Sequence, residues 1–104
     1  GHAGLFGSKN TSLKLGQLYL KGGGSLIAAE IVDKVIMDGE NGRTLGFSKE
    51  GMFSKGLGHT GFTGTMLYME PSSNSILVLL TNRLHVDTPR DISGIRKKII
   101  DLIH

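Results

Sequence analysis

Apolar residues recur with a helical period along the first part of the chain. Leu15, Leu18 and Tyr19 share one face of the segment 9–21, and this i, i+3, i+4 spacing predicts a helix. Ser8 precedes the segment and can cap its first turn with its hydroxyl. The sequence therefore predicts a helix over residues 9–21.

Glycine interrupts this helix once and then ends it. Inside a helix, Gly16 lowers stability by up to about 1 kcal/mol relative to alanine. Because glycine has no side chain, we expect Gly16 to let another helix pack closely. The run Gly22–Gly24 should stop the helix, since glycine is favoured just past a helix end. A second amphipathic pattern begins at Ser25 or Leu26 and continues to about Met37, which predicts a second helix.

The second half of the chain has the patterning of strands. Residues 44–48 form a short strand candidate, and 49–55 a loop that can turn as a hairpin at Glu50-Gly51. A strand is expected from Leu57 through His59. Residues 65–70 alternate in side-chain direction and predict another strand. The continuous apolar run 76–81 predicts a strand that is buried on both faces.

A turn and a final helix complete the predicted elements. Pro71–Asn74 has turn chemistry, so the strands on either side should pair antiparallel. Thr88, Pro89 and Asp91 have the order typical of a helix start, and apolar residues then recur to the end of the chain. The prediction is an α+β fold, a small antiparallel sheet of about three strands flanked by helices.

Composition agrees with one globular unit. The chain has 104 residues, 38% of them hydrophobic and 20% charged, which bounds it to a single domain, 1–104, or to part of one. It has no cysteine, which excludes disulfides and thiolate metal sites. No apolar run approaches the length of a membrane span. We expect no signal peptide in the first residues, and the missing initial Met suggests a piece of a longer chain.

Charge and histidine placement argue against two classes of partner. The net charge is +3, but the basic residues are scattered, and we interpret the one cluster, Arg96–Lys98, as a solvated helix face. Without a concentrated basic surface or tryptophan, we expect no nucleic-acid partner. His2, His59 and His85 lack the spacing of a metal site. We therefore expect neither a metal nor another cofactor.

The segment Lys55–Gly64 is the most informative stretch of the sequence. It reads KGLGHTGFTG and precedes two predicted strands. Glycines at this density let another group approach the backbone closely. A His-Thr-Gly triplet at the head of a strand pair is more typical of a site wall than of a plain hairpin.

These residues resemble a known family. The run Gly58–Thr65, followed by two strands, Thr81-Asn82-Arg83 and a last helix, resembles the C-terminal segment of the serine β-lactamase-like superfamily. That superfamily includes class C β-lactamases, D-Ala-D-Ala peptidases among the penicillin-binding proteins, and related esterases. His59-Thr60-Gly61 stands where these enzymes have Lys-Thr-Gly. Three further segments resemble parts of the same enzymes in the same order: Gly1–Phe6, Leu15–Leu20 and Leu45–Phe47.

Two motifs of that superfamily are absent from the sequence. No serine is followed by lysine three positions later, so the Ser-x-x-Lys nucleophile motif is missing. Tyr19 and Tyr68 are followed at the second position by Lys21 and Glu70, so there is no Tyr-x-Asn either. Both motifs precede the present segments in the family. The resemblance thus implies the C-terminal part of a longer hydrolase, inactive alone.

The resemblance also implies roles for individual residues. The Phe62 backbone N–H would be one oxyanion donor of an acyl-transfer reaction. Thr60 and Gly61 would bind substrate, and His59 would partly replace the usual lysine charge, which favours an esterase or peptidase over an efficient β-lactamase. Arg90 would lie near a substrate carboxylate. Each residue also has a structural interpretation: a strand-end histidine, a packed phenyl ring, a solvated arginine.

Three more residue interpretations and two functions stay open at this point. His2 can line the site, Asn82 can cap a strand end, and Met66 and Met69 are core or surface residues rather than a binding stripe. The chain is either the wall of such an enzyme or a binding module that never had a nucleophile. Its expected partners are the N-terminal part of a bacterial parent, exported or cytoplasmic, and a small acyl substrate. An uncovered sheet edge also predicts self-association, including a swapped dimer.

Overall fold

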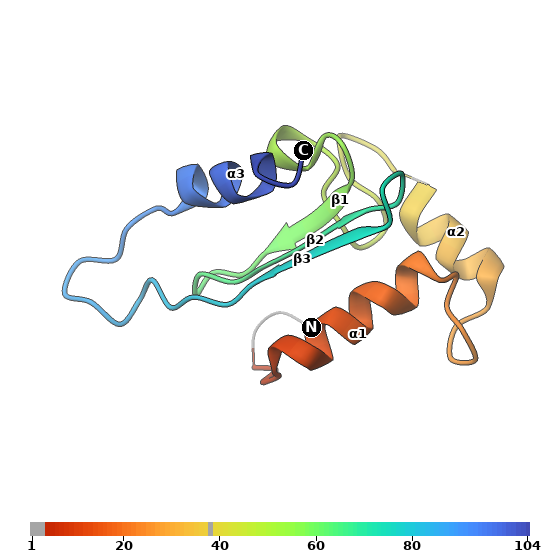
Figure 1. Ribbon diagram of the computed structural model, residues 1–104, viewed down its shortest axis with the longest axis horizontal. Coiled ribbons are helices and arrows are strands. Elements are labelled where there is room, and N and C mark those ends of the chain that lie inside the picture. The colour runs from red at the N-terminus through yellow and green to blue at the C-terminus, as the bar shows by residue number, and fades with distance from the viewer. Residues whose placement is uncertain (1–3, 38) are drawn as a thin grey trace.

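The computed structural model describes residues 4–37 and 39–104, and Figure 1 shows their arrangement. Helices and strands follow the order expected for an α+β fold. The helices are α1 (Lys9–Leu20), α2 (Ala29–Met37), the 3-10 helix η1 (Gly51–Phe53) and α3 (Ser93–Asp101). The strands are β1 (Leu57–Thr60), β2 (Met66–Glu70) and β3 (Ser75–Leu79).

The three strands form one antiparallel sheet in the order β1-β2-β3. Leu57 pairs with Met69 across β1 and β2, and Met66 pairs with Leu79 across β2 and β3. The predicted turn joins β2 to β3, and Asn74 takes a left-handed φ of 54° there, which asparagine tolerates better than most residues. The three strands predicted from Leu57 onward and the antiparallel pairing of the last two are confirmed.

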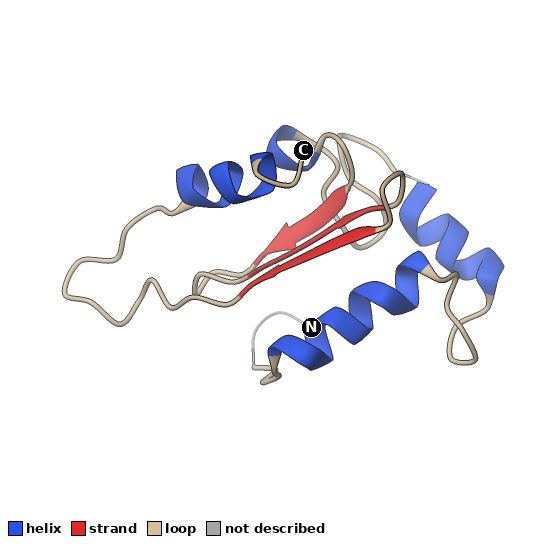
Figure 2. Ribbon diagram, in the orientation of Figure 1, coloured by secondary structure: helices blue, strands red, loops and turns tan. Residues whose placement is uncertain are grey.

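Each face of the sheet carries its own apolar cluster. Met66 and Tyr68 of β2 pack with Phe53 and Ile100, beneath η1 and α3. Met69 points to the opposite face, where α1 and α2 contribute the partly buried residues of a second cluster, which holds Phe47, Leu57 and Met69. Figure 2 shows helices on both sides of the strands. Strand alternation therefore buries Met66 and Met69 in two separate clusters.

Helix α1 begins as predicted and lies close to the sheet. The Ser8 hydroxyl accepts a hydrogen bond from Thr11 N–H. Gly16 faces β3, and a Cβ added to it would lie 2.9 Å from Ile76 Cγ2. The expected close packing at Gly16 thus occurs, but its partner is a strand and not a helix.

Two predictions between α2 and β1 are wrong. Residues 44–48 form a tight turn, because Thr44 Oγ1 accepts hydrogen bonds from the backbone N–H groups of Gly46 and Phe47. Only Ser48 pairs with the sheet, through a bridge to Gly58. The loop that follows contains the 3-10 helix η1 in place of a hairpin. Local side-chain hydrogen bonding competes here with strand formation.

Helix starts and the burial of β3 also differ from prediction. Helix α2 starts at Ala29, because Gly22–Gly24 have positive φ and their turn extends to Ile27. Helix α3 starts at Ser93, whose N–H donates to Asp91 Oδ1, so Thr88 is not its cap. Strand β3 is half-buried at all its positions, because it lies at the edge of the sheet.

Candidate functional site

A tight turn follows β1 and shapes the candidate site. Gly61 N–H donates to the Thr65 carbonyl at 2.8 Å, and Gly64 N–H donates to the Gly61 carbonyl at 3.1 Å. The second bond closes a four-residue turn with Phe62 at its first corner position. The Phe62 side chain is 73% exposed. The turn therefore presents the Phe62 residue at the end of the strand.

The glycines of this region are required by the packing of the chain itself. A Cβ on Gly58 would lie 2.6 Å from the Leu67 carbonyl oxygen and 2.7 Å from the Phe53 ring. A Cβ on Gly61 would collide with Thr65 Oγ1. The close approach predicted from the glycine density is thus made, at these two positions, by neighbouring strands and side chains.

Arg96 supports the turn through hydrogen bonds, and its interpretation as part of a solvated helix face is wrong. It is only 6% exposed, and its Nη2 donates to the carbonyls of Gly61 at 2.8 Å and Thr65 at 3.0 Å. Burial lowers the pKa of the Arg96 guanidinium, nearby Arg83 lowers it further, and Asp91 opposes the shift. A buried arginine needs several acceptors, and the turn carbonyls provide them.

Arg83 also binds this turn through its guanidinium. Its Nε donates to the Phe62 carbonyl at 2.7 Å, and its Nη1 donates to the Arg90 carbonyl at 3.2 Å. The guanidinium also lies 4.7 Å from the centre of the Phe62 ring, within the range of a cation–π contact. Together, the two arginines bind the carbonyls of Gly61 and Phe62 and so stabilise the turn.

The outer edge of β1, which faces away from β2, is covered at Gly58 by Ser48. Gly58 exchanges both backbone hydrogen bonds with Ser48. Because backbone groups alternate in direction along a strand, the N–H and C=O of Thr60 also point to this outer edge. Within residues 4–37 and 39–104, the Phe62 N–H has no acceptor in hydrogen-bond distance. The Thr60 N–H at this edge and the Phe62 N–H in the turn that follows are thus the donors available to an extended partner.

The His59 ring lies between Thr60 and Arg43. Its Nδ1 is 2.7 Å from the Thr60 carbonyl oxygen, and its Nε2 is 3.3 Å from Arg43 Nη2. A carbonyl oxygen only accepts and a guanidinium only donates, so Nδ1 carries the proton and Nε2 accepts. The ring thus joins the Thr60 carbonyl to the Arg43 guanidinium, which brings a positive charge to the edge of β1.

These residues surround a hollow of about 300 Å³ beside β1. Met52 and Phe53 contribute apolar side chains to its lining. Its polar lining comes from three parts of the chain, namely the 43–50 loop, β1 and the start of α3, with the side chains of Arg43, Ser48, Glu50, His59, Thr60, Ser93 and Arg96. The hollow is therefore lined mainly by polar side chains, together with the apolar Met52 and Phe53.

The structure brings together most of the residues predicted for the site. His59 and Thr60 line the hollow, and Gly61 and Phe62 form the adjoining turn. Arg90 is exposed and is tied to this turn only through its carbonyl. His2 lies outside the described residues. Asn82 follows β3, where its Oδ1 accepts from the N–H groups of Leu84 and His85.

Three arginines were missed as parts of this site. Arg96 was placed on a solvated face because its neighbours are lysines, although the apolar spacing of α3 could have been followed to it. Arg83 stood out only as a member of the Thr-Asn-Arg resemblance. Arg43 carries no local sequence signal, because its partner His59 is 16 positions away.

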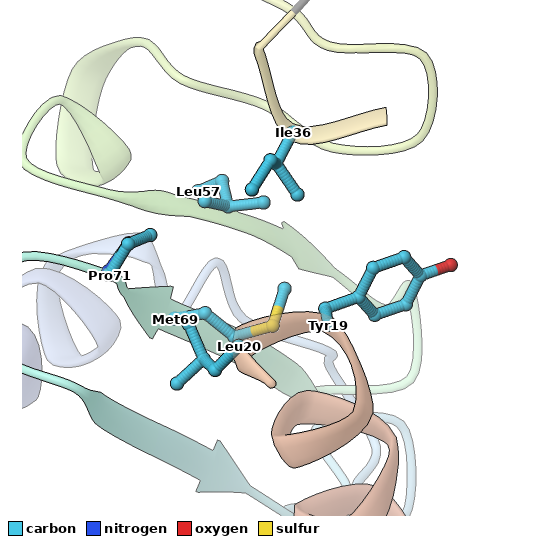
Figure 3. A pocket seen from close by; sticks show the side chains of 6 residues that line it. All are labelled: Tyr19, Leu20, Ile36, Leu57, Met69 and Pro71. Atoms are coloured by element: carbon cyan, nitrogen blue, oxygen red, sulfur yellow. The ribbon is translucent and has the colours of Figure 1, made fainter. Parts of the chain in front are cut away.

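A second pocket lies on the other face of the sheet (Figure 3). It measures about 60 Å³ and is lined by Tyr19, Leu20, Ile36, Leu57, Met69 and Pro71. The Tyr19 hydroxyl points away from the other side chains in this view, and its ring packs edge-on against Phe47 at 5.1 Å. An apolar space of this size is a gap in the core packing rather than a place for polar chemistry.

The remaining observations concern metal binding, membrane spans and similarity to known proteins. In the described part of the chain, no group of three or more histidine, aspartate or glutamate side chains is arranged to hold a metal ion. None of the described helices has the length and apolar character needed to cross a bilayer. Comparison of the chain with protein-family models, with curated proteins and with solved structures gives no match.

Proposed function

We propose that this chain supplies the substrate-binding wall of a serine acyl-transfer hydrolase. The reaction class would be hydrolysis of a β-lactam, a D-Ala peptide or an ester through an acyl-enzyme. The observation that carries the proposal is the Phe62 N–H, which has no acceptor among the described residues and lies in the turn that directly follows β1. A backbone N–H in this position can stabilise an oxyanion.

The rigidity of the turn supports this role. An oxyanion donor is effective when it is held in place before the reaction, so that no reorganisation is needed as charge develops. Arg96 binds the Gly61 carbonyl and Arg83 binds the Phe62 carbonyl. The peptide unit that carries the Phe62 N–H is thereby held through its own carbonyl, that of Gly61, and through the next carbonyl along the chain, that of Phe62.

The outer edge of β1 supports the binding part of the proposal. An extended substrate can add to a sheet edge through main-chain hydrogen bonds. Ser48 occupies this edge at Gly58. Beyond it the Thr60 N–H points outward, while the Thr60 carbonyl is bound by His59 Nδ1. An acyl substrate paired there would place its carbonyl beside the Phe62 N–H.

The nucleophile in this proposal comes from outside the 104 residues, because they contain no Ser-x-x-Lys. The chain alone is expected to take no covalent label from a fluorescent penicillin or a fluorophosphonate. Labelling of the isolated chain, located to one of its serines by mass spectrometry, would contradict this part of the proposal.

Phe62 offers a matched pair of variants for the oxyanion role. Phe62→Pro removes the N–H, and proline is favoured at the first corner of such a turn, so the fold should be kept. Phe62→Ala removes the ring and keeps the N–H. In a longer protein that contains this chain and a Ser-x-x-Lys motif, the proline variant should slow acylation by about 10²–10³-fold, and the alanine variant by far less.

The measurement is the rate of acylation by a chromogenic β-lactam or a p-nitrophenyl ester. Circular dichroism of both variants serves as the control for folding. Equal rates in the proline and alanine variants, with the fold intact, would remove the Phe62 N–H from the mechanism.

A non-catalytic binding module is the second candidate function. It is favoured by the missing nucleophile and by the exposed Phe62 ring beside Arg83, a combination that can bind a peptide at a sheet edge. The upstream reading frame separates the two functions. Ser-x-x-Lys and Tyr-x-Asn upstream support the enzyme, and a natural start near Gly1 supports the module.

A further inference from the structure

Helix α3 carries an apolar stripe that the sheet does not cover. Arg96 and Ile100 are the buried residues of this helix. Ile95, Ile99 and Leu102 follow one another at the i, i+4, i+7 spacing of a separate stripe, here called the α3 stripe. Ile95 is 56% exposed and Leu102 is 83% exposed, so most of the α3 stripe is open to solvent.

The course of α3 over the sheet follows from the contacts at its two ends. Arg96 donates to the Thr65 carbonyl just before β2 begins, and His104 contacts Glu70, the last residue of β2. The helix therefore lies lengthwise over the middle strand. Its two flanks then face the two outer strands, β1 and β3.

The α3 stripe lies on the flank that faces β3. Successive residues of a helix are turned by about 100°, so Ser93 and the α3 stripe lie on opposite sides of the line through Arg96 and Ile100. Ser93 lines the hollow beside β1. The opposite flank, with the α3 stripe, therefore points toward β3.

The side chains of β3 on this face of the sheet are only partly covered. Leu77 and Leu79 pair with Tyr68 and Met66, so they lie on the same face as those residues. They contact the cluster around Ile100 but stay half-buried. The α3 stripe and these two leucines thus form the wall and the floor of one apolar surface, here called the apolar corner.

The opposite face of the sheet shows what such a surface accommodates. There α1 packs on β3, and Figure 1 shows α1 and α3 on opposite sides of the strands. Helices pack about 8–10 Å apart and neighbouring strands lie about 4.8 Å apart, so a helix packed beside α3 would lie above β3 and its outer edge. A ridge with i, i+4, i+7 spacing is also the kind of surface on which a second helix packs.

Lys98 adds a charge at the rim of the apolar corner. It follows Ile95 by three positions and precedes Leu102 by four, so its side chain borders the same flank. Lys98 is exposed, and within residues 4–37 and 39–104 no carboxylate lies within 4.0 Å of its ammonium group. A partner with acidic side chains beside its apolar face would therefore match the corner in charge.

We propose that the apolar corner is the docking site for an amphipathic helix from outside the 104 residues, with acidic side chains along the border of its apolar face. The corner lies on the β3 side of α3, whereas the candidate site lies on the β1 side. This inference therefore does not rest on the proposed function, and the acylation test with the Phe62 variants leaves it untouched.

The test uses two synthetic helical peptides as probes. One has leucines on one face and glutamates along the borders of that face, and the other has lysines in place of the glutamates. Each is titrated at constant ionic strength into the chain labelled at its Ile, Leu and Val methyl groups. We expect the methyl signals of the α3 stripe to shift, and the glutamate peptide to bind about threefold or more tightly than the lysine peptide.

Three variants assign the binding to the corner. Leu102→Gln should weaken binding of the glutamate peptide by about tenfold, since a buried leucine is lost from the interface. Leu26→Gln makes the same change at a leucine of matched exposure, 81%, in the turn before α2, and should leave binding unchanged. Lys98→Glu should reverse the preference between the two peptides. Circular dichroism of all variants is the control for folding.

Three results would overturn the inference. One is the absence of peptide-induced shifts at the α3 stripe in the folded chain. Another is an equal loss of binding in Leu102→Gln and Leu26→Gln, which would reflect general apolar adhesion. The third is a set of concentration-dependent shifts of Ile95 and Leu102 without peptide that persists when Val78→Pro blocks the edge of β3, because the corner would then be filled by a second copy of the chain.

Discussion

Tyr68, Glu70 and His104 form a polar group between β2 and the residues after α3. Tyr68 is fully buried and Glu70 is 6% exposed. His104 Nε2 is 3.3 Å from the Tyr68 hydroxyl, and its Nδ1 is 3.4 Å from Glu70 Oε1. Ser73 Oγ donates to the other carboxylate oxygen of Glu70. At the residue scale, this group satisfies a buried phenol and a buried carboxylate together.

The Tyr68 phenol should make stability fall at alkaline pH. Burial, and then the charge of Glu70, raise the pKa of Tyr68 above its ordinary 10.0. The unfolded state therefore loses this proton first, so the contribution is complete below pH 10 and is lost as pH rises through the folded pKa. Tyr68→Phe should remove this part of the alkaline loss.

The measurement is the free energy of unfolding by denaturant, taken at intervals from about pH 8 to about pH 11 for both proteins. An alkaline loss of the same size in the wild type and in Tyr68→Phe would show that Tyr68 does not contribute.

At the element scale, α1 and β3 depend on each other. Strand β3 is an edge strand with half-buried residues, and α1 is one of the elements that cover it. Gly16 sets their separation, because its missing side chain leaves room for Ile76. The glycine that weakens the helix locally thus allows the helix to cover the sheet.

A larger residue at Gly16 should separate these elements. Gly16→Val is expected to lower the free energy of unfolding by about 1–3 kcal/mol, the usual cost of overpacking. Gln17→Val places the same side chain on the exposed face of α1 and should cost less than about 1 kcal/mol. Denaturant unfolding measures both, and a smaller loss for Gly16→Val than for Gln17→Val would contradict the close packing.

At the scale of the whole molecule, the sheet is covered on its faces but open at an edge. In the register of β2 and β3, Ile76 and Val78 direct their N–H groups away from β2. Large apolar side chains are also exposed on the helices and next to them, among them Leu26 at 81% and Leu102 at 83%. An open edge together with exposed apolar side chains favours pairing between copies.

Self-association should therefore increase with concentration and depend on the edge of β3. Val78→Pro removes one outward N–H and leaves the ladder with β2 in place, so it should shift the protein toward monomer. Sedimentation velocity over a wide concentration range measures this, with circular dichroism as the control for folding. A wild-type chain that stays monomeric and binds little apolar dye would contradict the prediction.

Local signals in the sequence were enough for several elements. The Ser8 cap, the apolar period of α1, the alternation in β2 and the turn at Pro71–Asn74 predicted their elements correctly, because each depends on neighbours in the chain. The turn at Thr44 was misread as a strand, since its apolar residues Leu45 and Phe47 fit a strand pattern while the Thr44 hydroxyl closes the turn. For the candidate site, the sequence predicted the segment 59–62 but not the arginines around it.

By itself, the sequence determined the α+β class, the order of the three main helices and three strands, and the importance of the segment around Gly61, because these follow from periodicity and local backbone chemistry. Only the tertiary structure decided which charges surround that turn. Arg83 and Arg96 bind its carbonyls and Arg43 binds the neighbouring His59, from three separate segments. The burial and partners of these arginines depend on contacts between residues far apart in the chain. Long-range packing thus made Arg96, which was expected on a solvated face, a buried support of the turn, and it placed the Arg43 guanidinium beside His59.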